Sequence, residues 1–318
     1  MANPLSISVF VPVYNSEQSL GLLVERLYPI LTAITPEFEL ILVNDGSRDN
    51  SWSVVESLIA QHQWVMGINL MRNFGQHNAL LCGIRAATKE LVVTIDDDLQ
   101  NPPEEIPRLL EELNKGFDVV YGTPQKMQHG LFRNMASRIT KIALQGSMGV
   151  SIATKVSAYR VFRTQLREAF DDYKGVYVSI DVLLTWATTK FSAIDVRFDV
   201  RQFGVSNYTL MKLIRHAMNM ITGFSVVPLQ LASILGFIFT AFGIFVFIYV
   251  VIRFILEGGS IPGFPFLASI IAIFSGVQLF ALGIIGEYLA RMHVRLMDKP
   301  TYVVRKMTYP NQDHNKGS

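Results

Sequence analysis

Two long stretches without a charged side chain restrict this sequence more than any other feature. No Asp, Glu, Lys or Arg occurs from His216 to Ile252, and none occurs from Gly258 to Gly286. Each stretch is longer than the roughly 20 residues that a helix needs to cross about 30 Å of hydrocarbon. A buried helix of a water-soluble domain rarely needs so long an uncharged run, so the sequence predicts a hairpin of two membrane-spanning helices.

The flanks of these stretches predict an orientation. Basic residues lie at the outer ends of both runs: Lys212, Arg215, Arg291, Arg295 and Lys299. Because positive charge favours the cytoplasmic side, both termini are expected in the cytoplasm. A single cysteine, Cys82, suits that reducing compartment as a buried thiol. The net charge of +2 is too small to argue for a nucleic-acid partner.

The first 200 residues alternate between two hydrophobic periods. Apolar runs typical of buried strands occur at residues 6–13, 38–45, 65–71, 91–98 and 118–122. Helical patterns lie between them at residues 17–31, 51–61, 76–87 and 104–114. This alternation predicts a mostly parallel sheet with helices on both faces. In such sheets, ligands bind beyond the carboxyl ends of the strands.

Three of the predicted strands end in polar residues. The first is followed by Tyr14, Asn15 and Glu17, the second by Asp45, and the fourth by the triplet at 96–98. Any one of these could be an ordinary helix cap. Three acidic ends on one rim would instead form a crevice for a cation and for hydrogen-bond donors such as ribose hydroxyls or a base imide.

The triplet Asp96, Asp97 and Asp98 raises a question of charge, because adjacent carboxylates repel one another. Solvent, basic residues or a bound cation could offset them. Alternation along an extended strand would place Asp96 and Asp98 on one face and turn Asp97 toward solvent or a helix terminus. Mg²⁺ suits such a pair, because it binds few carboxylates and takes its other ligands from phosphate and water.

Four segments together resemble family 2 glycosyltransferases that act on polyprenyl phosphates. They are VPVYNSE, VNDGSRDNS, RNFGQHNALLCGI and DDDLQNPPEEIPRLL. This group includes dolichol-phosphate mannose synthases, undecaprenyl-phosphate glucosyltransferases and undecaprenyl-phosphate formamido-arabinose transferases. The resemblance runs from about residue 6 to residue 305. It implies a GT-A-type nucleotide-sugar-binding domain followed by the transmembrane hairpin.

The resemblance also implies site residues. Those expected to bind the nucleotide sugar are Pro12, Tyr14, Asn15, Glu17, Asp45, Asp96 and Asp97. Asp96, Asp98 and Gln100 would hold Mg²⁺ or Mn²⁺ on the diphosphate, and Asp98 is expected to be catalytic.

The acceptor side lies further along the chain. SAYRVFR and RQFGVSNYTLMKLI resemble family segments that contact the donor diphosphate and the lipid phosphate, with Ala158 in place of glycine and Asn207 in place of lysine. Arg160, Arg201 and Ser206 are therefore expected at the acceptor phosphate, both arginines also as catalytic residues. Several relatives carry an acidic residue at the position of Thr154, so a protein base is not expected here.

The domain boundaries follow from these patterns. We expect a cytoplasmic GT-A domain at 1–205, an interfacial amphipathic helix at 206–224, two transmembrane helices at 225–290 and a cytoplasmic tail at 291–318. The stretch 131–148 is also amphipathic and basic. It either lies at the membrane surface or packs on the soluble domain.

The sequence thus predicts an inverting, metal-dependent transferase of the bacterial inner membrane. It would move a sugar from a nucleotide donor, with UDP-glucose favoured, to undecaprenyl or another polyprenyl phosphate for modification of the cell envelope. A GDP-mannose-dependent enzyme and a non-catalytic membrane scaffold remain as alternatives, and a homo-oligomer is left open. A processive polysaccharide synthase is disfavoured, because the sequence lacks a Gln-x-x-Arg-Trp motif and further spans.

Overall fold

The computed structural model describes residues 5–124, 150–153, 155–175, 178–200, 227–256 and 263–310. The chain divides into two compact units. An α/β unit contains residues Met1–Ile214 together with Lys299–Ser318, and a helical unit contains Arg215–Asp298. The segment that follows the second predicted span therefore belongs to the α/β unit.

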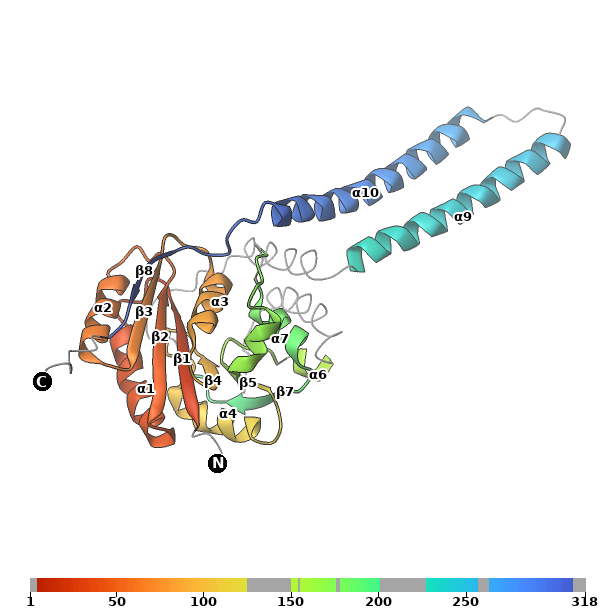
Figure 1. Cartoon of the computed structure of the whole chain (residues 1–318). Helices are drawn as coiled ribbons and strands as arrows, with labels where there is room; N and C mark the ends of the chain where they lie inside the picture. The colour runs from red at the N-terminus through yellow and green to blue at the C-terminus, as the bar shows by residue number, and fades with distance from the viewer. Residues whose placement is uncertain are drawn as a thin grey trace, which may run out of the picture. The chain divides into compact units, whose positions relative to one another are not determined.

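An eight-stranded sheet forms the centre of the α/β unit, in the order β7-β5-β6-β4-β1-β2-β3-β8 (Figure 1). The strands are β1 (Ser6–Val13), β2 (Glu37–Asn44), β3 (Val65–Leu70), β4 (Leu91–Thr94), β5 (Val119–Pro124), β6 (Arg160–Arg163), β7 (Phe191–Val196) and β8 (Val304–Thr308). The pairs β1–β2, β1–β4, β2–β3 and β5–β7 are parallel, whereas β6 and β8 are antiparallel to their neighbours. The predicted mostly parallel sheet is confirmed.

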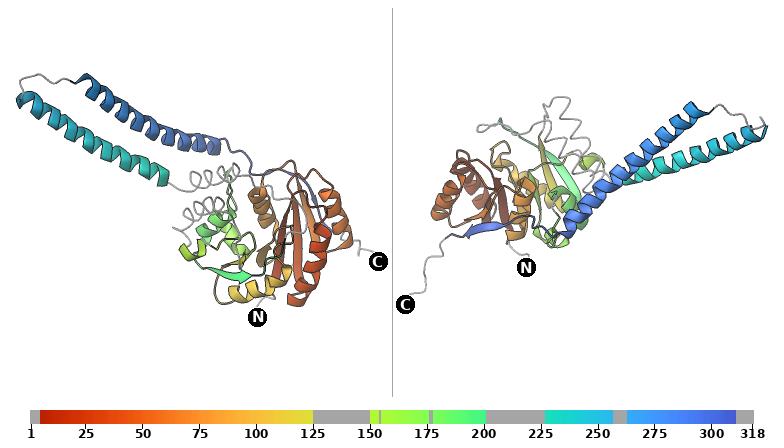
Figure 2. Two further views of the ribbon diagram at one scale, coloured as in Figure 1. Left: turned by 180° about the vertical axis from the view of Figure 1, so that it is seen from behind. Right: turned by 90° about the horizontal axis from the view of Figure 1, so that it is seen from above.

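Helices cover both faces of the sheet (Figure 1; Figure 2). Side chains of α1 (Leu20–Ile34), α2 (Ser51–Gln61) and α4 (Ile106–Leu113) join Val9 and Val11 of β1 in one buried cluster. On the opposite face, α3 (Gln76–Ala86) packs so closely on β1 that a side chain at Gly83 would overlap the Phe10 ring. Alternate residues of β1 thus reach opposite helix layers, which explains why the strand is apolar throughout.

The remaining helices of this unit are short. They are η1 (Pro103–Glu105), α6 (Val150–Ala153), η2 (Thr164–Ala169) and α7 (Ile180–Ala187). The predicted helix at 104–114 is present as η1 followed by α4. Its first turn contains Pro103, where the missing amide hydrogen costs nothing. Cys82 is buried, as expected.

Residues 291–318 differ from the predicted tail. The second long helix continues to Leu296, and β8 then pairs antiparallel with β3 at the edge of the sheet. Met71 N donates to Val303 O at 2.9 Å, and Lys306 forms an ion pair with Glu56. Strand β8 was not predicted, because its partner strand lies more than 200 residues away and the alternation of its side chains is weak.

The helical unit contains α9 (Val227–Leu256) and α10 (Phe264–Leu296), which run side by side (Figure 1). The rings of Phe242 and Phe274 stack between them, with centroids 6.3 Å apart. At 1.5 Å per residue, a helix of 30 residues is about 45 Å long, which exceeds the hydrocarbon thickness of a membrane. Large apolar side chains are exposed along both helices; Phe237, for example, is 77% exposed. Helices of this length with such surfaces are suited to lipid.

Candidate active site

Three polar loops meet at the carboxyl ends of β4, β1 and β2, which are neighbours in the sheet. They are residues 14–19, 45–50 and 95–102, and we call them the rim loops. The chain crosses from β3 back to β4 on the other side of β1, so the strand order reverses here. Ligands of open α/β sheets bind at such reversals.

The first two rim loops are joined by hydrogen bonds. Asn15 has a positive φ of 56°, and its side-chain oxygen accepts a bond from Arg48 N at 2.8 Å. Glu17 Oε2 accepts a bond from Asn50 N at 3.0 Å. Tyr14 is half-buried at the same place, and Pro12 pairs with Val43 inside the sheet. The structure therefore brings the predicted residues of these loops together.

Asp45 organises a further loop. Its side chain is buried, and its two carboxylate oxygens accept bonds from Phe74 N at 2.7 Å and Gly75 N at 2.8 Å. Burial raises the pKa of Asp45 above its ordinary value, although the two backbone donors partly oppose this. Its predicted contact with a nucleotide stays a prediction. The structure adds the role of fixing the loop after β3.

Gly46 completes this arrangement. Its φ is +65°, and a Cβ at this position would lie 2.5 Å from Asn73 N. Only glycine combines that backbone conformation with such a close approach. Together, Asp45 and Gly46 hold residues 72–75 against the end of β2.

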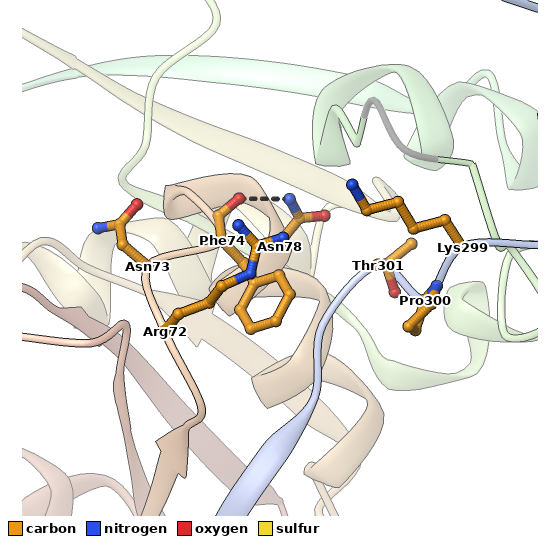
Figure 3. A pocket seen from close by; sticks show the side chains of 7 residues that line it. All are labelled: Arg72, Asn73, Phe74, Asn78, Lys299, Pro300 and Thr301. Atoms are coloured by element: carbon orange, nitrogen blue, oxygen red, sulfur yellow. Dashed lines mark hydrogen bonds between the residues drawn. The ribbon is translucent and has the colours of Figure 1, made fainter. Parts of the chain in front are cut away.

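A pocket of about 120 Å³ lies beside that loop (Figure 3). It is lined by Arg72, Asn73, Phe74, Asn78, Lys299, Pro300 and Thr301. Asn78 donates to Phe74 O at 2.6 Å, while its Oδ1 atom is buried without a hydrogen-bond partner among the described residues. The guanidinium of Arg72 lies 4.5 Å from the centre of the Phe74 ring. The segment after α10 thus forms one wall of a basic pocket next to the rim.

The triple aspartate lies in a turn rather than on the strand. β4 ends at Thr94, and Leu99 reverses the chain with a φ of 60°. Asp96 accepts a bond from Gln76 Nε2 at 2.8 Å, and Asp98 accepts one from Gln100 N at 3.1 Å. The expected alternation along an extended strand is therefore wrong at this point, because the strand has already ended.

Asp97 turns toward the loop after β1. It accepts a hydrogen bond from Ser16 Oγ and a second from Tyr14 N at 3.3 Å. Burial raises the pKa of Asp97 to about 6, and the neighbouring charge of Asp98 adds to the shift. Of the two expected environments, solvent or a helix terminus, Asp97 lies nearer the second: Ser16 O accepts the amides of Ser19 and Leu20 at the start of α1, and donors from this loop partly replace the water around Asp97.

Arg160 occupies a different environment from the one expected. Its side chain is fully buried at 1% exposure and forms an ion pair with Asp181. Arg160 Nε donates to Thr94 Oγ1 at 3.2 Å, and Tyr121 donates to Asp181 at 3.1 Å. A guanidinium with these partners supports the packing of β6 against β4. This position does not support the predicted direct contact with a phosphate.

Several sequence predictions lie outside the described residues. These are Thr154, Arg201, Ser206 and the amphipathic stretches 131–148 and 206–224. Their roles stay predictions.

Three contacts at or near the site escaped the sequence analysis. Gln76, the first residue of α3, reaches Asp96, Ser16 reaches Asp97, and Asp181 neutralises Arg160. The rule that chemistry follows strand ends could have identified Gln76, because it lies six residues beyond β3. No local signal marks Asp181, which lies in the first turn of α7.

The residues available to a metal are oxygen donors. Among the described residues, no three His, Cys, Asp or Glu side chains are arranged to bind a metal by themselves. Asp96, Asp98 and Gln100 occupy one turn, while Asp97 is engaged elsewhere. Such a donor set fits a hard cation that obtains its other ligands from phosphate and water.

Comparison with known proteins agrees with this architecture. Residues 8–173 match glycosyl transferase family 2. The undecaprenyl-phosphate 4-deoxy-4-formamido-L-arabinose transferases of Photorhabdus laumondii and Serratia proteamaculans are each 34% identical over 97% of this chain and 96% of their own. The crystal structure of a mycobacterial protein has a similar fold, with a TM-score of 0.50, 18% identity and coverage of 69% of this chain and 73% of that one. The chain belongs to glycosyl transferase family 2, and it is a glycosyltransferase.

Proposed function

We propose that this enzyme transfers 4-deoxy-4-formamido-L-arabinose, or a closely similar sugar, from a uridine diphosphate donor to undecaprenyl phosphate. The observation that carries the proposal is the 34% identity over nearly the whole chain, hairpin included, to transferases named for that sugar and acceptor. Their names favour this sugar over glucose, which the sequence motifs had favoured.

The rim loops supply the donor site of this proposal. Tyr14, Asn15 and Glu17 would face the nucleoside, and Asp96 and Asp98 the diphosphate. The side chains of Asn15 and Glu17 accept hydrogen bonds from backbone amides of the loop after β2, which orders the first two rim loops before the donor arrives and lowers the entropy cost of binding.

Asp96, Asp98 and Gln100 would hold Mg²⁺ or Mn²⁺ there. When bound, the cation would offset the charge that grows on the departing diphosphate. The chain's own contribution is to keep two carboxylates in one turn and to direct the third away from them.

The reaction needs no protein base. An oxygen of the lipid phosphate attacks the anomeric carbon, a new carbon–oxygen bond forms, and the bond to the diphosphate breaks with its electron pair. A phosphomonoester with a second pKa near 6 is mostly a dianion at neutral pH. Direct attack inverts the anomeric centre, and positioning supplies much of the rate.

The hairpin would bring the enzyme to its lipid substrate. Helices α9 and α10 are long and apolar enough to cross a membrane. Basic residues at their outer flanks favour a topology with both termini and the α/β unit in the cytoplasm, where nucleotide sugars are made. For a bacterial enzyme this is the inner membrane.

A donor screen tests the proposal. The full-length protein in lipid nanodiscs is incubated with undecaprenyl phosphate, Mg²⁺ and radiolabelled donors, and label in the lipid fraction is counted. UDP-4-deoxy-4-formamido-L-arabinose should give product, whereas UDP-glucose and GDP-mannose should give little. Product from GDP-mannose alone would contradict the assigned donor.

Tags test the topology in intact cells. A tag after Met1 and one after Ser318 should be protected from external protease, while a tag between Gly258 and Gly259 should be cleaved. External cleavage at either terminus would contradict the orientation.

A further inference from the structure

Asp97, the middle aspartate of the triplet, forms hydrogen bonds with the loop after β1. Asp97 receives both the Ser16 hydroxyl and the Tyr14 backbone amide, and residues 16 and 97 are far apart in the sequence. A single carboxylate therefore joins two of the three rim loops. We propose that Asp97 is a positioning residue that fixes the nucleoside-facing loop relative to the metal-facing turn, an inference that rests on the proposed function.

The backbone on both sides of this contact needs support. Asn15 and Leu99 have φ values of 56° and 60°, a region that residues other than glycine rarely occupy. Such conformations are unfavourable by themselves and persist where the surroundings hold them. Asp97 accepts hydrogen bonds from Tyr14 and Ser16, the residues on either side of Asn15, and it precedes Leu99 by two residues. These bonds therefore restrain a loop whose backbone conformation at Asn15 is unfavourable by itself.

The contact is also directional. A carboxylate that accepts two bonds from one loop fixes both the distance and the angle of that loop. The backbone amide of Tyr14 donates a hydrogen bond to Asp97, which fixes the backbone position from which the Tyr14 side chain extends. Asp96 and Asp98 flank Asp97 in the same turn, so their backbone positions are tied to the same contact. The spacing between the two ends of a bound donor would then be set before binding, which is the condition for positioning catalysis.

This role differs from that of a donor ligand. A ligand would lose its interaction with the nucleotide when replaced, whatever residue stands at position 16. A positioning residue acts through the loop that it holds, so Ser16→Ala should reproduce much of the effect of Asp97→Ala. The two roles therefore predict different results for a pair of substitutions.

A double-mutant cycle on nucleotide affinity separates them. UDP is titrated into the full-length protein in nanodiscs with Mg²⁺, using Ser16→Ala, Asp97→Ala and the double variant. Each single change should weaken UDP binding by about tenfold, the effect of losing one hydrogen bond to a charged group. The double variant should bind no more than about twofold more weakly than Asp97→Ala, because Ser16→Ala breaks a bond that Asp97→Ala already breaks.

Two variants serve as controls. Ser57→Ala removes an exposed hydroxyl that accepts one bond from Gln61, and Glu111→Gln removes an exposed carboxylate of α4. Both should bind UDP like the wild type. Ser16→Thr keeps the hydroxyl and should restore most of the affinity.

The outcome that would overturn the proposal is an Asp97→Ala loss of a hundredfold with Ser16→Ala unchanged. That result would make Asp97 a direct ligand. Additive losses in the double variant would likewise contradict a shared contact.

Hydrogen exchange without nucleotide keeps this test independent of the proposed function. Amides of residues 14–19 should exchange faster in Ser16→Ala and in Asp97→Ala than in the wild type, with α2 unchanged. Unaltered exchange in both variants would overturn the positioning role. Failure of the wild type to bind UDP, with exchange altered as expected, would contradict the uridine donor and leave the loop contact supported.

Discussion

Acidic residues of the rim and of the core solve the same electrostatic problem in opposite ways. Asp96, Asp97 and Asp98 accept bonds from amides and a hydroxyl in a turn that is only half-buried. Asp181 is 8% exposed and is paired with the guanidinium of Arg160. A carboxylate that accepts a hydrogen bond from a neutral donor keeps its net charge and can still bind a cation. In an ion pair the charge of the carboxylate is already neutralised by a side chain of the protein.

The comparison teaches that residue type does not decide function at this site. Arg160 resembled a phosphate ligand in the sequence, yet its partners are Asp181 and Thr94. Loss of a rim charge should therefore stop catalysis with little unfolding. Loss of the core pair should instead lower the stability of the α/β unit. The following predictions test that division.

The largest effect is expected at the rim. Asp98→Asn removes one charged ligand to the proposed cation, and transfer to undecaprenyl phosphate should fall by on the order of a hundredfold or more. Chelator should have the same effect on the wild type, and Mg²⁺ or Mn²⁺ should restore activity. The thermal unfolding midpoint should stay within about 2 °C of the wild type. Asp195→Asn, at an exposed position on β7, is the matched control.

Full activity of the wild type in chelator would contradict the metal site. A large fall in the midpoint of Asp98→Asn would instead erase the distinction between rim and core.

The core pair should dominate stability. Arg160→Ala leaves the buried carboxylate of Asp181 without its partner, which costs about 3–5 kcal/mol. For a unit of this size the midpoint should fall by about 10 °C. Arg160→Met combined with Asp181→Leu should recover part of the loss, because it removes both charges. The measurement is thermal unfolding of the full chain in detergent.

A stable Arg160→Ala protein that has lost only its activity would revive the phosphate contact. Recovery in the double variant would support the structural role.

Asp45 should give an intermediate effect, since it is a buried carboxylate with backbone partners. Asp45→Asn can still accept one bond, but it leaves the amide of Phe74 or Gly75 unpaired, at a cost of about 1–3 kcal/mol. Hydrogen exchange at residues 74 and 75 should accelerate, and donor KM should rise more than kcat falls. Unchanged exchange at these amides would show that the loop is held by other contacts.

The smallest effect is a pH dependence of the same residue. Burial raises the pKa of Asp45 above 3.8, so the folded protein keeps this proton to higher pH than the unfolded chain does. Its contribution to the free energy of unfolding should therefore be greatest below pH 3.8 and should fall as the pH rises through the folded pKa. The difference in midpoint between wild type and Asp45→Asn, measured from pH 4 to pH 8, should follow this trend. A difference that grows in favour of the wild type with rising pH would contradict the sign of the shift.

Local patterns predicted much of the fold. The limits of α2 and β1 agree with those expected, and α3 ends one residue early. Within the site, the strand-end rule placed Tyr14, Asp45 and Asp96 on one rim, and the structure has them in loops after the neighbouring strands β1, β2 and β4. These features depend on side-chain period and on the geometry of parallel sheets, which repeat along the sequence.

The sequence alone determined the hairpin, the strand–helix alternation and the acidic rim, because each of these features depends on residues that are close together in the chain. Only the tertiary structure decided the partners of individual charges. Asp97 meets Ser16, Arg160 meets Asp181, and β8 pairs with β3 across most of the chain length. Hydrophobic period specifies which face of an element is buried. It does not specify which distant polar group will lie opposite a charge, since that depends on how the completed elements pack.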